Sequence, residues 1–383
     1  MLACLPAVAE TDPYYLGASA RYTHYSNVNQ AAGLSSSDNV LSTSLFAGLD
    51  QPFGRQRVRA DAMIDHNNYR SSSALNNISY RVSGGLDWAT IERLSGNVSA
   101  YSARSLAQYA VDGITASTSE RTLVQTDGFS TVARMGVVTR LTVEGNYAHD
   151  RTRYSGQALV ISNTFNNDRD TLGASLRYQF SSAMMAGLGL RYTEGDYPGR
   201  LTANHYKRHD IDFPFGYTPS AITSFQGRVS LTKTQYNNTS AFDLSGITGT
   251  LTWLWQVTGK TSISTSYDRD SGREASLIRT TVGGPLLLDD QSRVNNTLRT
   301  QVKHQLTGKV STFAGAAYTR RSTVNTVSLA AGNDDLRQFT LGANWDASRA
   351  INAGCDLSLS TRDTGLGNYD YNSVGCQVRI TLR

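Results

Sequence analysis

Long hydrophobic runs are absent from this sequence. No stretch approaches the roughly 18 consecutive apolar residues that a transmembrane helix needs, so the sequence excludes helices that span a membrane. Proline is scarce, with 7 residues, and no segment shows the 3.6-residue period of an amphipathic helix. The net charge of +5 comes without a basic cluster that contains aromatic residues, so we expect no nucleic-acid partner. The 33 glycines and 20 tyrosines, with many serines, threonines and asparagines, suit strands and turns.

Motifs for catalysis, cofactor binding and metal binding are also absent. The 6 histidines are scattered along the chain. His205 and His209 are four positions apart, but their segment lacks a helical pattern, so we do not expect them to share a metal ion. Gly187-x-Gly189 lacks the third glycine and the following helix of a dinucleotide loop, and no G-x-S-x-G motif occurs. We therefore expect no catalytic residue, no cofactor and no metal.

The segment from Thr171 to Thr193 carries the clearest positive pattern. In its first arm, up to Phe180, even-numbered positions are apolar or aromatic and odd-numbered positions are small or polar. After a tight turn the second arm, from Met184, repeats the pattern. Side chains on a strand alternate between faces, so this segment predicts a β-hairpin with one apolar and one polar face. Each arm spans about ten residues, the length of a tilted strand that crosses a bilayer.

The same alternation recurs along the chain. It is found in segments 16–22, 41–49, 58–64, 80–88, 94–100, 141–147, 225–231, 247–255, 261–267, 294–302, 310–318, 339–345, 351–359 and 374–382. Two weaker segments lie near 125–136 and 205–220, the second interrupted by Pro214 and Pro219. With the two arms of the hairpin, the sequence predicts about 18 strands, with 16 as the alternative. We therefore predict an all-β protein, an antiparallel up-and-down β-barrel in the bacterial outer membrane.

The predicted connections alternate in length. Short ones fall near 50–56, 89–93, 136–139, 181–183, 257–260, 306–309 and 346–350, and long ones near 24–39, 67–76, 103–124, 151–170, 194–208, 269–292, 320–336 and 361–370. Outer-membrane barrels have short periplasmic turns and long external loops. Two acidic pairs, Asp289-Asp290 and Asp334-Asp335, fall in long connections, where we expect solvated loop tips rather than calcium ligands.

Aromatic residues mark both ends of the predicted strands. Trp88, Phe180, Trp255 and Trp345 each precede a short turn, and Tyr22, Tyr147, Tyr192 and Tyr267 each precede a long loop. All eight share the apolar parity of their strands. This arrangement predicts two aromatic girdles at the membrane interfaces. A soluble β-sandwich, the alternative for alternating strands, would sort neither turn lengths nor aromatics in this way.

The N-terminal residues suggest the end of a signal peptide. Ala7-Val8-Ala9 fits a cleavage site after a short apolar stretch. We therefore interpret residues 1–9 as a residual signal peptide and residues 10–383 as a single barrel domain.

Cys355 and Cys376 share the apolar parity of the last two strands. They are equidistant from the centre of the connection at Thr364-Gly-Leu-Gly367, so they should lie directly opposite each other. Because the periplasm is oxidising, we predict a disulfide between them, the alternative being two free thiols facing lipid.

The polar parity collects charged residues that would line the lumen. Its cations are Arg21, Arg57, Arg59, Arg81, Arg140, Arg177, Arg191, Arg228, Arg299, Lys303 and Arg379, against Asp61, Asp65, Asp87, Glu144, Asp150, Asp268 and Asp356. We predict that Arg57, Arg59, Arg81, Arg140, Arg177, Arg191 and Arg228 contact a solute or polymer, because arginine binds carboxylate or phosphate. The alternative is that these arginines pair with lumen carboxylates. Tyrosines near the loops, namely Tyr25, Tyr69, Tyr109, Tyr154 and Tyr197, could stack on sugar rings or be solvated.

The segment Glu10-Thr-Asp-Pro-Tyr-Tyr-Leu-Gly-Ala-Ser-Ala-Arg-Tyr-Thr-His-Tyr-Ser-Asn-Val28 resembles the opening of EpsL-type outer-membrane proteins, and residues 81–88 and the closing strand also fit. Proteins of this family are grouped with β-barrel porins and accompany exopolysaccharide biosynthesis systems of the exosortase-associated kind. The resemblance implies an outer-membrane pore that exports a polysaccharide, neutral or anionic, with a periplasmic export protein as partner and lipopolysaccharide around it. One departure is the final residue, since most such barrels end in an aromatic residue and this sequence ends Ile380-Thr-Leu-Arg383.

Three hypotheses follow for function. The first is the polysaccharide export pore that the resemblance implies. The second is a general diffusion porin for small solutes, since about 18 strands leave an aqueous channel. The third is an outer-membrane barrel enzyme, which would need a nucleophile and a base at the rim that the sequence does not supply; we expect no enzyme.

Overall fold

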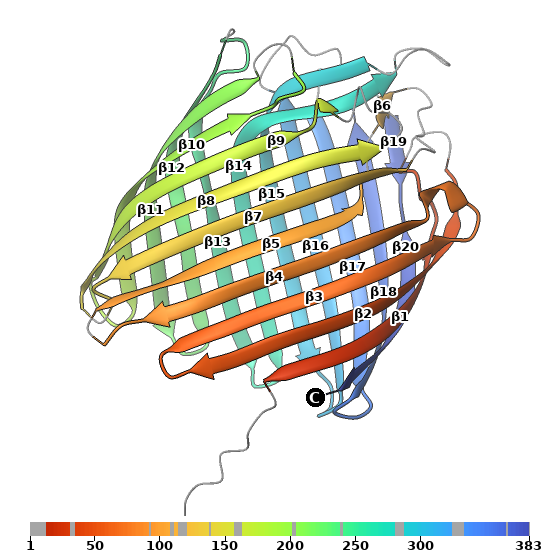
Figure 1. The fold of residues 1–383 in the computed structure, drawn as a ribbon, viewed down its shortest axis with the longest axis horizontal. Coiled ribbons are helices and arrows are strands. Elements are labelled where there is room, and N and C mark those ends of the chain that lie inside the picture. Colours follow the sequence, from red (N-terminus) through yellow and green to blue (C-terminus); the bar gives the residue numbers. More distant parts are fainter. Residues whose placement is uncertain are drawn as a thin grey trace, which may run out of the picture.

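The chain forms a closed antiparallel β-barrel (Figure 1). The computed structural model describes residues 13–30, 35–91, 93–107, 111–113, 121–137, 139–156, 163–200, 204–237, 240–279, 287–323, 333–364 and 367–382. The strand β1 pairs with β2 on one side and with the last strand, β20, on the other, which closes the ring. The helical element is the short turn η1 (Ser73–Leu75), and no helix in the described ranges is long and apolar enough to span a membrane.

The strands, in chain order, are β1 (Tyr14–Tyr25), β2 (Asp38–Phe53), β3 (Gln56–Tyr69), β4 (Asn77–Ala89), β5 (Leu94–Leu106), β6 (Val111–Gly113), β7 (Thr122–Met135), β8 (Leu141–Gly156), β9 (Asn167–Gln179), β10 (Met184–Asp196), β11 (His205–Ser220), β12 (Thr223–Tyr236), β13 (Leu244–Thr258), β14 (Thr261–Arg279), β15 (Leu287–Gln305), β16 (Val310–Thr323), β17 (Asn333–Asp346), β18 (Ile351–Thr364), β19 (Gly367–Asp370) and β20 (Ser373–Leu382). Of these 20 strands, β6 and β19 are short additions at the outer end, and the other 18 form the ring. The predicted strand number is therefore confirmed, including the two weak strands, β7 and β11.

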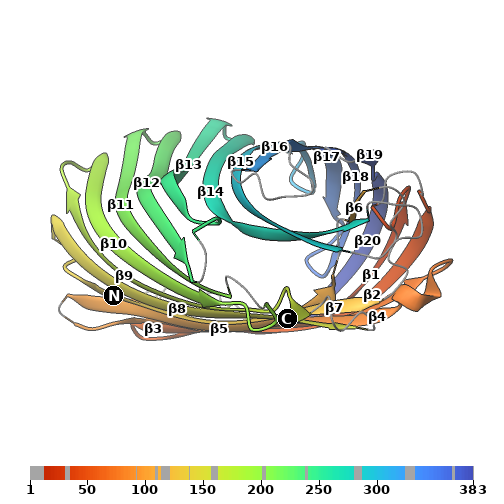
Figure 2. The same ribbon diagram turned by 90° about the horizontal axis from the view of Figure 1, so that it is seen from above.

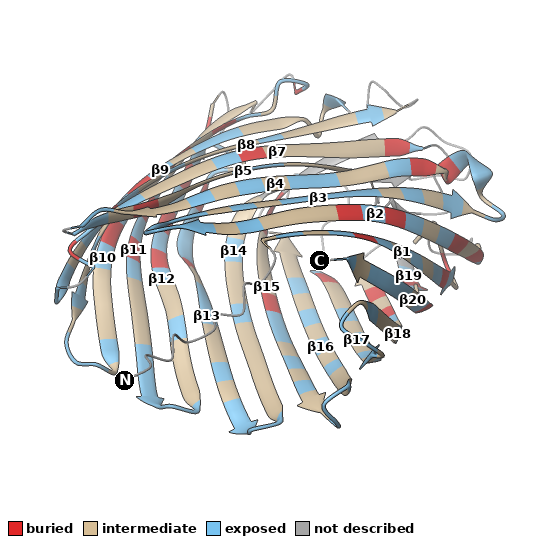
Figure 3. Ribbon diagram, turned by 60° about the horizontal axis from the view of Figure 1, so that its bottom comes forward, coloured by how far each residue is buried: buried red, intermediate tan, exposed pale blue. Residues whose placement is uncertain are grey.

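The outer surface of the ring is apolar and the inner surface is polar. Leu172, Leu188 and Leu341 are 60%, 52% and 58% exposed, as expected for side chains that face lipid. Buried residues are few and most are polar, which is the reverse of a soluble domain with a hydrophobic core (Figure 3). The alternation of apolar and polar residues along each strand therefore fits lipid on the outside and water on the inside.

The chain connects its strands by short turns at one end and longer segments at the other. The predicted short turns are confirmed, and two connections were missed, a turn at 221–222 and a longer segment at 237–243. Both described ends of the chain, Pro13 and Leu382, lie at the end with the short turns, which is the periplasmic end in this fold. The predicted residual signal peptide, residues 1–9, lies outside the described residues.

The prediction of a long loop at 269–292 is wrong. There β14 and β15 continue as a paired hairpin up to Ile278 and Leu287, and the end of β14 pairs in parallel with β6. Seen from above, this hairpin curves across the outer opening of the barrel (Figure 2). The backbone hydrogen bonds of the extension explain why strands persist beyond the membrane-spanning length.

The prediction that Asp334-Asp335 is a solvated loop tip is also wrong. Both residues belong to β17, and Asp334 is buried, with Arg362 Nη2 at 2.6 Å from Oδ2. Asp335 accepts a hydrogen bond from the Tyr318 hydroxyl at 2.8 Å. For the other pair, Asp289-Asp290, the backbone lies in β15.

The eight predicted girdle aromatics all lie on the outward face of their strands. At the periplasmic end Phe180 and Trp345 are exposed, and Trp255 stacks on Trp253 with ring centroids 5.5 Å apart. At the outer end Tyr147 donates its hydroxyl hydrogen bond to Asp170 at 2.6 Å. An apolar ring with one polar end suits the boundary between lipid and water, so the two girdles fix the depth of the barrel.

Several glycines on the strands lie directly opposite an aromatic residue. On the lumen side, Tyr101 pairs with Gly128 and Tyr206 pairs with Gly195. In each pair a Cβ added to the glycine would lie within 2.4 Å of the tyrosine ring, so the ring occupies the space of the missing side chain. These glycines let large rings lie flat on the lumen wall.

The predicted disulfide is present between β18 and β20. Cys355 and Cys376 are direct partners in the register and their sulfur atoms are bonded. Both side chains lie on the outward face, as their parity predicted.

Candidate functional site in the lumen wall

The seven arginines predicted to contact a solute lie at the lumen but are spread around the ring. Arg57 and Arg59 are on β3, Arg81 on β4, Arg140 in the turn after β7, Arg177 on β9, Arg191 on β10 and Arg228 on β12. Each strand arginine alternates with the exposed apolar side chains of its strand, so it faces inward. The structure therefore brings Arg191 and Arg228 together and separates them from Arg57, Arg59 and Arg81.

Most of these arginines are paired with carboxylates on neighbouring strands, the alternative that the sequence left open. The ion pairs are Arg57–Asp50 at 2.5 Å, Arg59–Asp87, Arg177–Glu144 at 2.8 Å, Arg191–Asp212 at 3.0 Å and Arg228–Asp212 at 3.7 Å. Arg21 on β1 likewise pairs with Asp356 on β18 at 2.9 Å. These contacts neutralise charge and hold the side chains against the wall.

A second set of lumen cations has no carboxylate partner. Within the described part of the chain, no acidic oxygen lies within 4.0 Å of Arg81, Arg140, Arg299, Lys303 or Arg379, and all five side chains are exposed. The lumen carboxylates without a basic partner among the described residues are Asp38, Asp61, Asp65, Asp268 and Asp346. Over all the described strands the inward positions still carry more arginines and lysines than carboxylates, so the inner surface has an excess of positive charge.

Glu144 on β8 joins two arginines at the lumen wall. Arg134 Nε on β7 donates to its Oε2 at 2.7 Å, and Arg177 Nη2 on β9 donates to its Oε1 at 2.8 Å. The carboxylate side chain is only 10% exposed. One buried negative charge thus holds two cations at adjacent strands, and the group keeps a net positive charge.

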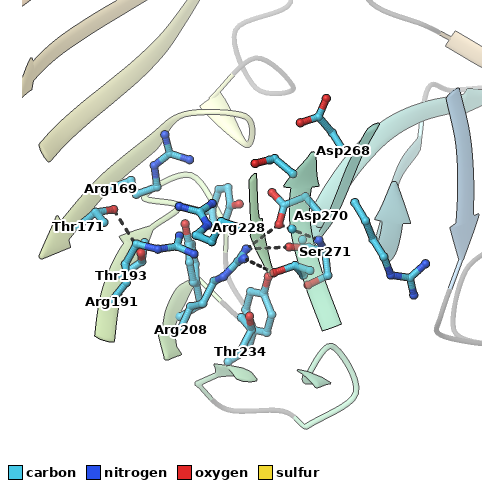
Figure 4. Close-up of a pocket in the computed structure, with 18 residues that line it drawn as sticks. Arg169, Thr171, Arg191, Thr193, Arg208, Arg228, Thr234, Asp268, Asp270 and Ser271 are labelled. Carbon is cyan, nitrogen blue, oxygen red and sulfur yellow. Dashed lines mark hydrogen bonds and ion pairs between the residues drawn. The ribbon is translucent and has the colours of Figure 1, made fainter. Parts of the chain in front are cut away.

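The densest group of charges lies on β9 to β12, nearer the outer end of the barrel. We call Arg169, Arg191, Arg208 and Arg228 the arginine row. Figure 4 shows their side chains around a common cavity of about 580 Å³, with Asp268 and Asp270 of β14 on the far side. Thr171, Thr193, Thr234 and Thr248 add hydroxyl groups to the same lining.

Two buried carboxylates on β11, Asp210 and Asp212, bind arginines of the arginine row. Asp210, fully buried, lies 3.0 Å from Arg208 Nε and 3.3 Å from Arg191 Nη2. Asp212 accepts hydrogen bonds from Arg191 and from the Ser230 hydroxyl, the latter at 2.5 Å. Because these acceptors are fixed in the sheet, Arg191 and Arg208 are held in place before any solute arrives.

Three tyrosines form an arc beside the arginine row. The Tyr206 ring has its centroid 5.9 Å from that of Tyr197 and 5.5 Å from that of Tyr236. All three line the cavity. Tyr197 was among the tyrosines for which the sequence left both sugar stacking and solvation open. Of the others, Tyr25, Tyr69 and Tyr154 lie on strands away from this cavity, and Tyr109 lies outside the described residues.

The sequence reasoning missed Arg169, Arg208, Asp210 and Asp212. The last three lie on β11, which was weakly predicted because Pro214 and Pro219 interrupt it. The alternation that identifies a strand was nevertheless present on β11. Its polar residues Arg208, Asp210 and Asp212 alternate with His209, Ile211 and Phe213, as polar and apolar residues do on the other strands. Pro214 lacks an N–H donor, and the pairing of β11 with β10 is interrupted beside it, at Gly187 and Leu188, whereas its pairing with β12 is regular.

Metal-binding groups were not expected. The described residues contain no set of three or more His, Cys, Asp or Glu side chains that could hold a metal ion. His205 and His209 both lie on the outward face of β11, where His205 Nδ1 is 2.8 Å from Asp196.

Known proteins resemble this chain in fold but not in sequence. No protein-family model matches the sequence, and no curated protein matches it either. Among solved structures, the outer membrane protein OpdK of Pseudomonas aeruginosa has 11% identity and a TM-score of 0.50, with 96% of this chain and 98% of that chain covered. OccK2 (OpdF) of the same organism has 11% identity and a TM-score of 0.51, with 96% and 98% covered.

A second OccK2 structure is a complex with glucuronate; it has a TM-score of 0.51 and 11% identity, with 97% of this chain and 98% of that chain covered. At these identities the likeness establishes the fold alone. The specific resemblance to EpsL-type proteins gains no support from the comparisons. A closed ring of 18 strands, apolar outside and polar inside, that shares its fold with outer-membrane proteins over nearly the full length places this chain in the bacterial outer membrane.

Proposed function

We propose that this protein is a passive channel for small hydrophilic solutes, with a preference for anions. The observation that carries the proposal is the set of exposed, unpaired cations on the lumen wall, such as Arg81, Arg299 and Lys303. Charged groups that line a pore raise the local concentration of oppositely charged solutes. A barrel of this strand number is wide enough for an aqueous passage.

Two further observations support a small-solute channel. Solved barrels of this fold include one with a bound sugar acid, glucuronate. The β14–β15 hairpin curves across the outer opening, which favours small solutes over a bulky chain (Figure 2). The proposal thus corresponds to the porin hypothesis from the sequence.

Uptake into proteoliposomes tests the proposal. We expect radiolabelled glucuronate to enter faster than glucose, a neutral sugar of similar size. Replacing Arg81, Arg299 and Lys303 together by glutamine should lower the ratio of glucuronate to glucose entry. Arg320→Gln, an exposed arginine on the outward face of β16, is the control and should leave the ratio unchanged. Absence of uptake of both sugars by the folded protein would contradict the proposal.

Export of an anionic polysaccharide is the second candidate. The same cationic wall favours it, together with the sequence resemblance, which implies a periplasmic export protein as partner. Deleting the gene distinguishes the two candidates. Loss of surface polymer with intact precursor synthesis would favour export, and unchanged polymer with slower small-solute uptake would favour the channel.

A further inference from the structure

The cavity beside the arginine row differs from the rest of the lumen wall in its chemistry. Elsewhere the wall carries single cations, ion pairs and small groups of charges around one carboxylate, such as Glu144 with Arg134 and Arg177. Here arginines, aspartates, threonines and tyrosines converge on one space of about 580 Å³, a volume typical of pockets for small ligands. The strands β9 to β14 supply the lining, so the cavity rests on a rigid sheet (Figure 4).

Arg228 is the arginine of this cavity whose hydrogen bonds are incomplete. Its Nε atom is buried and has no hydrogen-bond partner in the described residues. The nearest acidic oxygen, Asp212 Oδ1, is 3.7 Å from that nitrogen, too far for a hydrogen bond. No hydrogen bond joins the guanidinium of Arg228 to another described residue, and the side chain is 40% exposed, so its Nη groups can donate to an acceptor in the cavity.

Arg191 and Arg208, in contrast, already donate hydrogen bonds to carboxylates of the protein. Arg191 donates from two nitrogens to Asp212, at 3.0 and 3.2 Å, and Arg208 donates to Asp210 and Asp270. Their role is to form a fixed positive background behind Arg228. Asp212 also accepts a hydrogen bond from the Ser230 hydroxyl.

The tyrosine arc gives the cavity an aromatic side. The Tyr206 ring lies flat over Gly195, where an added Cβ would be 2.3 Å from the ring. Tyr197 and Tyr236 flank this ring. Asp268, across the cavity, forms no ion pair with another described residue, so its carboxylate is available to accept hydrogen bonds.

We infer that this cavity is a binding site for an acidic sugar, a pyranose ring that carries a carboxylate. The inference rests on the proposed channel function and names its preferred solute. The carboxylate would accept hydrogen bonds from Arg228, the ring would pack on Tyr206, and ring hydroxyls would donate to Asp268.

A different group in the cavity would bind each part of this ligand. A simple inorganic anion would use the arginine but not the aromatic arc. A neutral sugar would use Tyr206 and Asp268 but leave the exposed Nη groups of Arg228 without a charged acceptor. Only a solute with both a ring and an anionic group matches all three, because charge-assisted hydrogen bonds and ring packing contribute independently.

Block of the ion current in a planar bilayer tests the inference. The folded full-length protein is reconstituted, and galacturonate, galactose or acetate is added on the side of the long connections. We expect galacturonate to reduce the current at lower concentration than either galactose or acetate. In Arg228→Gln the half-blocking concentration of galacturonate should rise by about tenfold, which corresponds to the loss of one charge-assisted hydrogen bond.

Matched variants separate the contributions. Tyr206→Phe keeps the ring and should keep the block, whereas Tyr206→Ala should weaken it. Arg320→Gln, on the outward face, should behave as the original protein. If Arg228→Gln does not fold, as judged by its mobility on a gel before and after boiling, Arg228→Lys replaces it and should also weaken the block.

The outcomes also separate this inference from the proposed function. An open channel that galactose, acetate and galacturonate block equally would overturn the acidic-sugar site and leave the channel intact. Galacturonate block that is unchanged in the folded Arg228 variant would do the same. A folded protein without any conductance would overturn the channel function itself.

Discussion

At the scale of single residues, Glu144 shows how the lumen wall keeps cations in place. Its carboxylate accepts hydrogen bonds from Arg134 and Arg177, and it is nearly buried between β7 and β9. Removing the negative charge would leave two guanidinium groups side by side without their shared acceptor. Polar groups that lose a buried partner destabilise the folded state.

Glu144→Gln is therefore expected to lower the free energy of unfolding by about 1–3 kcal/mol. It should also increase the preference of the channel for anions, because one lumen carboxylate is lost. Urea unfolding in lipid vesicles, followed by tryptophan fluorescence, and the reversal potential in a salt gradient measure the two effects. An unchanged unfolding midpoint would show that the two hydrogen bonds contribute no net stability.

Gly128 is a second residue that determines how side chains pack on the lumen wall. A Cβ at this position would lie 2.1 Å from the Tyr101 ring, whose hydroxyl donates to Asp150 at 3.0 Å. Gly128→Ala should push the ring off the wall, break this hydrogen bond and lower the free energy of unfolding by about 1–2 kcal/mol.

The matched control is Gly246→Ala. Gly246 lies on β13, and an added Cβ there would have no atom within 4 Å. Alanine at this position should leave the stability unchanged or raise it slightly, because it restricts the unfolded chain. Equal effects of the two substitutions in urea unfolding would contradict the explanation by ring contact.

At the scale of elements, the disulfide joins the last two strands of the ring. Cys355 on β18 and Cys376 on β20 are direct partners, 21 positions apart in sequence. A bond that closes a loop of this length stabilises a fold by roughly 3 kcal/mol, mainly through the unfolded chain. The bond also lies next to the seam, since β20 pairs with β1.

Cys355→Ser with Cys376→Ser should therefore move the urea midpoint downward by an amount equivalent to roughly 2–4 kcal/mol. The original protein in the presence of reductant, unfolded and refolded, should match the double variant. Identical midpoints for oxidised and reduced protein would exclude a stabilising role for the bond.

The β14–β15 hairpin is the element that departs most from a plain barrel. It extends beyond the ring and the end of β14 pairs with β6, so backbone hydrogen bonds hold it across the outer opening (Figure 2). Replacing residues 274–290 by a short turn should raise the single-channel conductance, because the extension no longer covers part of the opening. A conductance equal to that of the full chain would mean that the hairpin does not narrow the passage.

Much of this architecture could be predicted from the sequence, because alternate residues of each strand in a membrane barrel face lipid and the lumen and are therefore apolar and polar in turn. The hairpin from Thr171 to Thr193 followed from parity, and the facing cysteines followed from parity together with their equal distance from the centre of the connection. The extension of β14 and β15 did not, since alternation stops where the strands leave the membrane. The pairing of Arg191 with Asp210 and Asp212 was also hidden, because it depends on the stagger between strands, which parity does not specify.

At the scale of the whole molecule, the account depends on a hollow ring. The outward leucines are exposed, and so are inward cations such as Arg81 and Arg299. A sheet with both faces exposed and no hydrophobic core is stable only when lipid covers one face and water the other. The proposed channel uses this lumen as its path across the membrane.

The reversal potential across a planar bilayer, in a gradient of potassium chloride, tests this account most directly. The folded full-length protein should form an open channel whose reversal potential has the sign of chloride selectivity, as the unpaired lumen cations require. A channel that selects potassium, or a folded protein inserted in the bilayer that carries no current, would contradict the account.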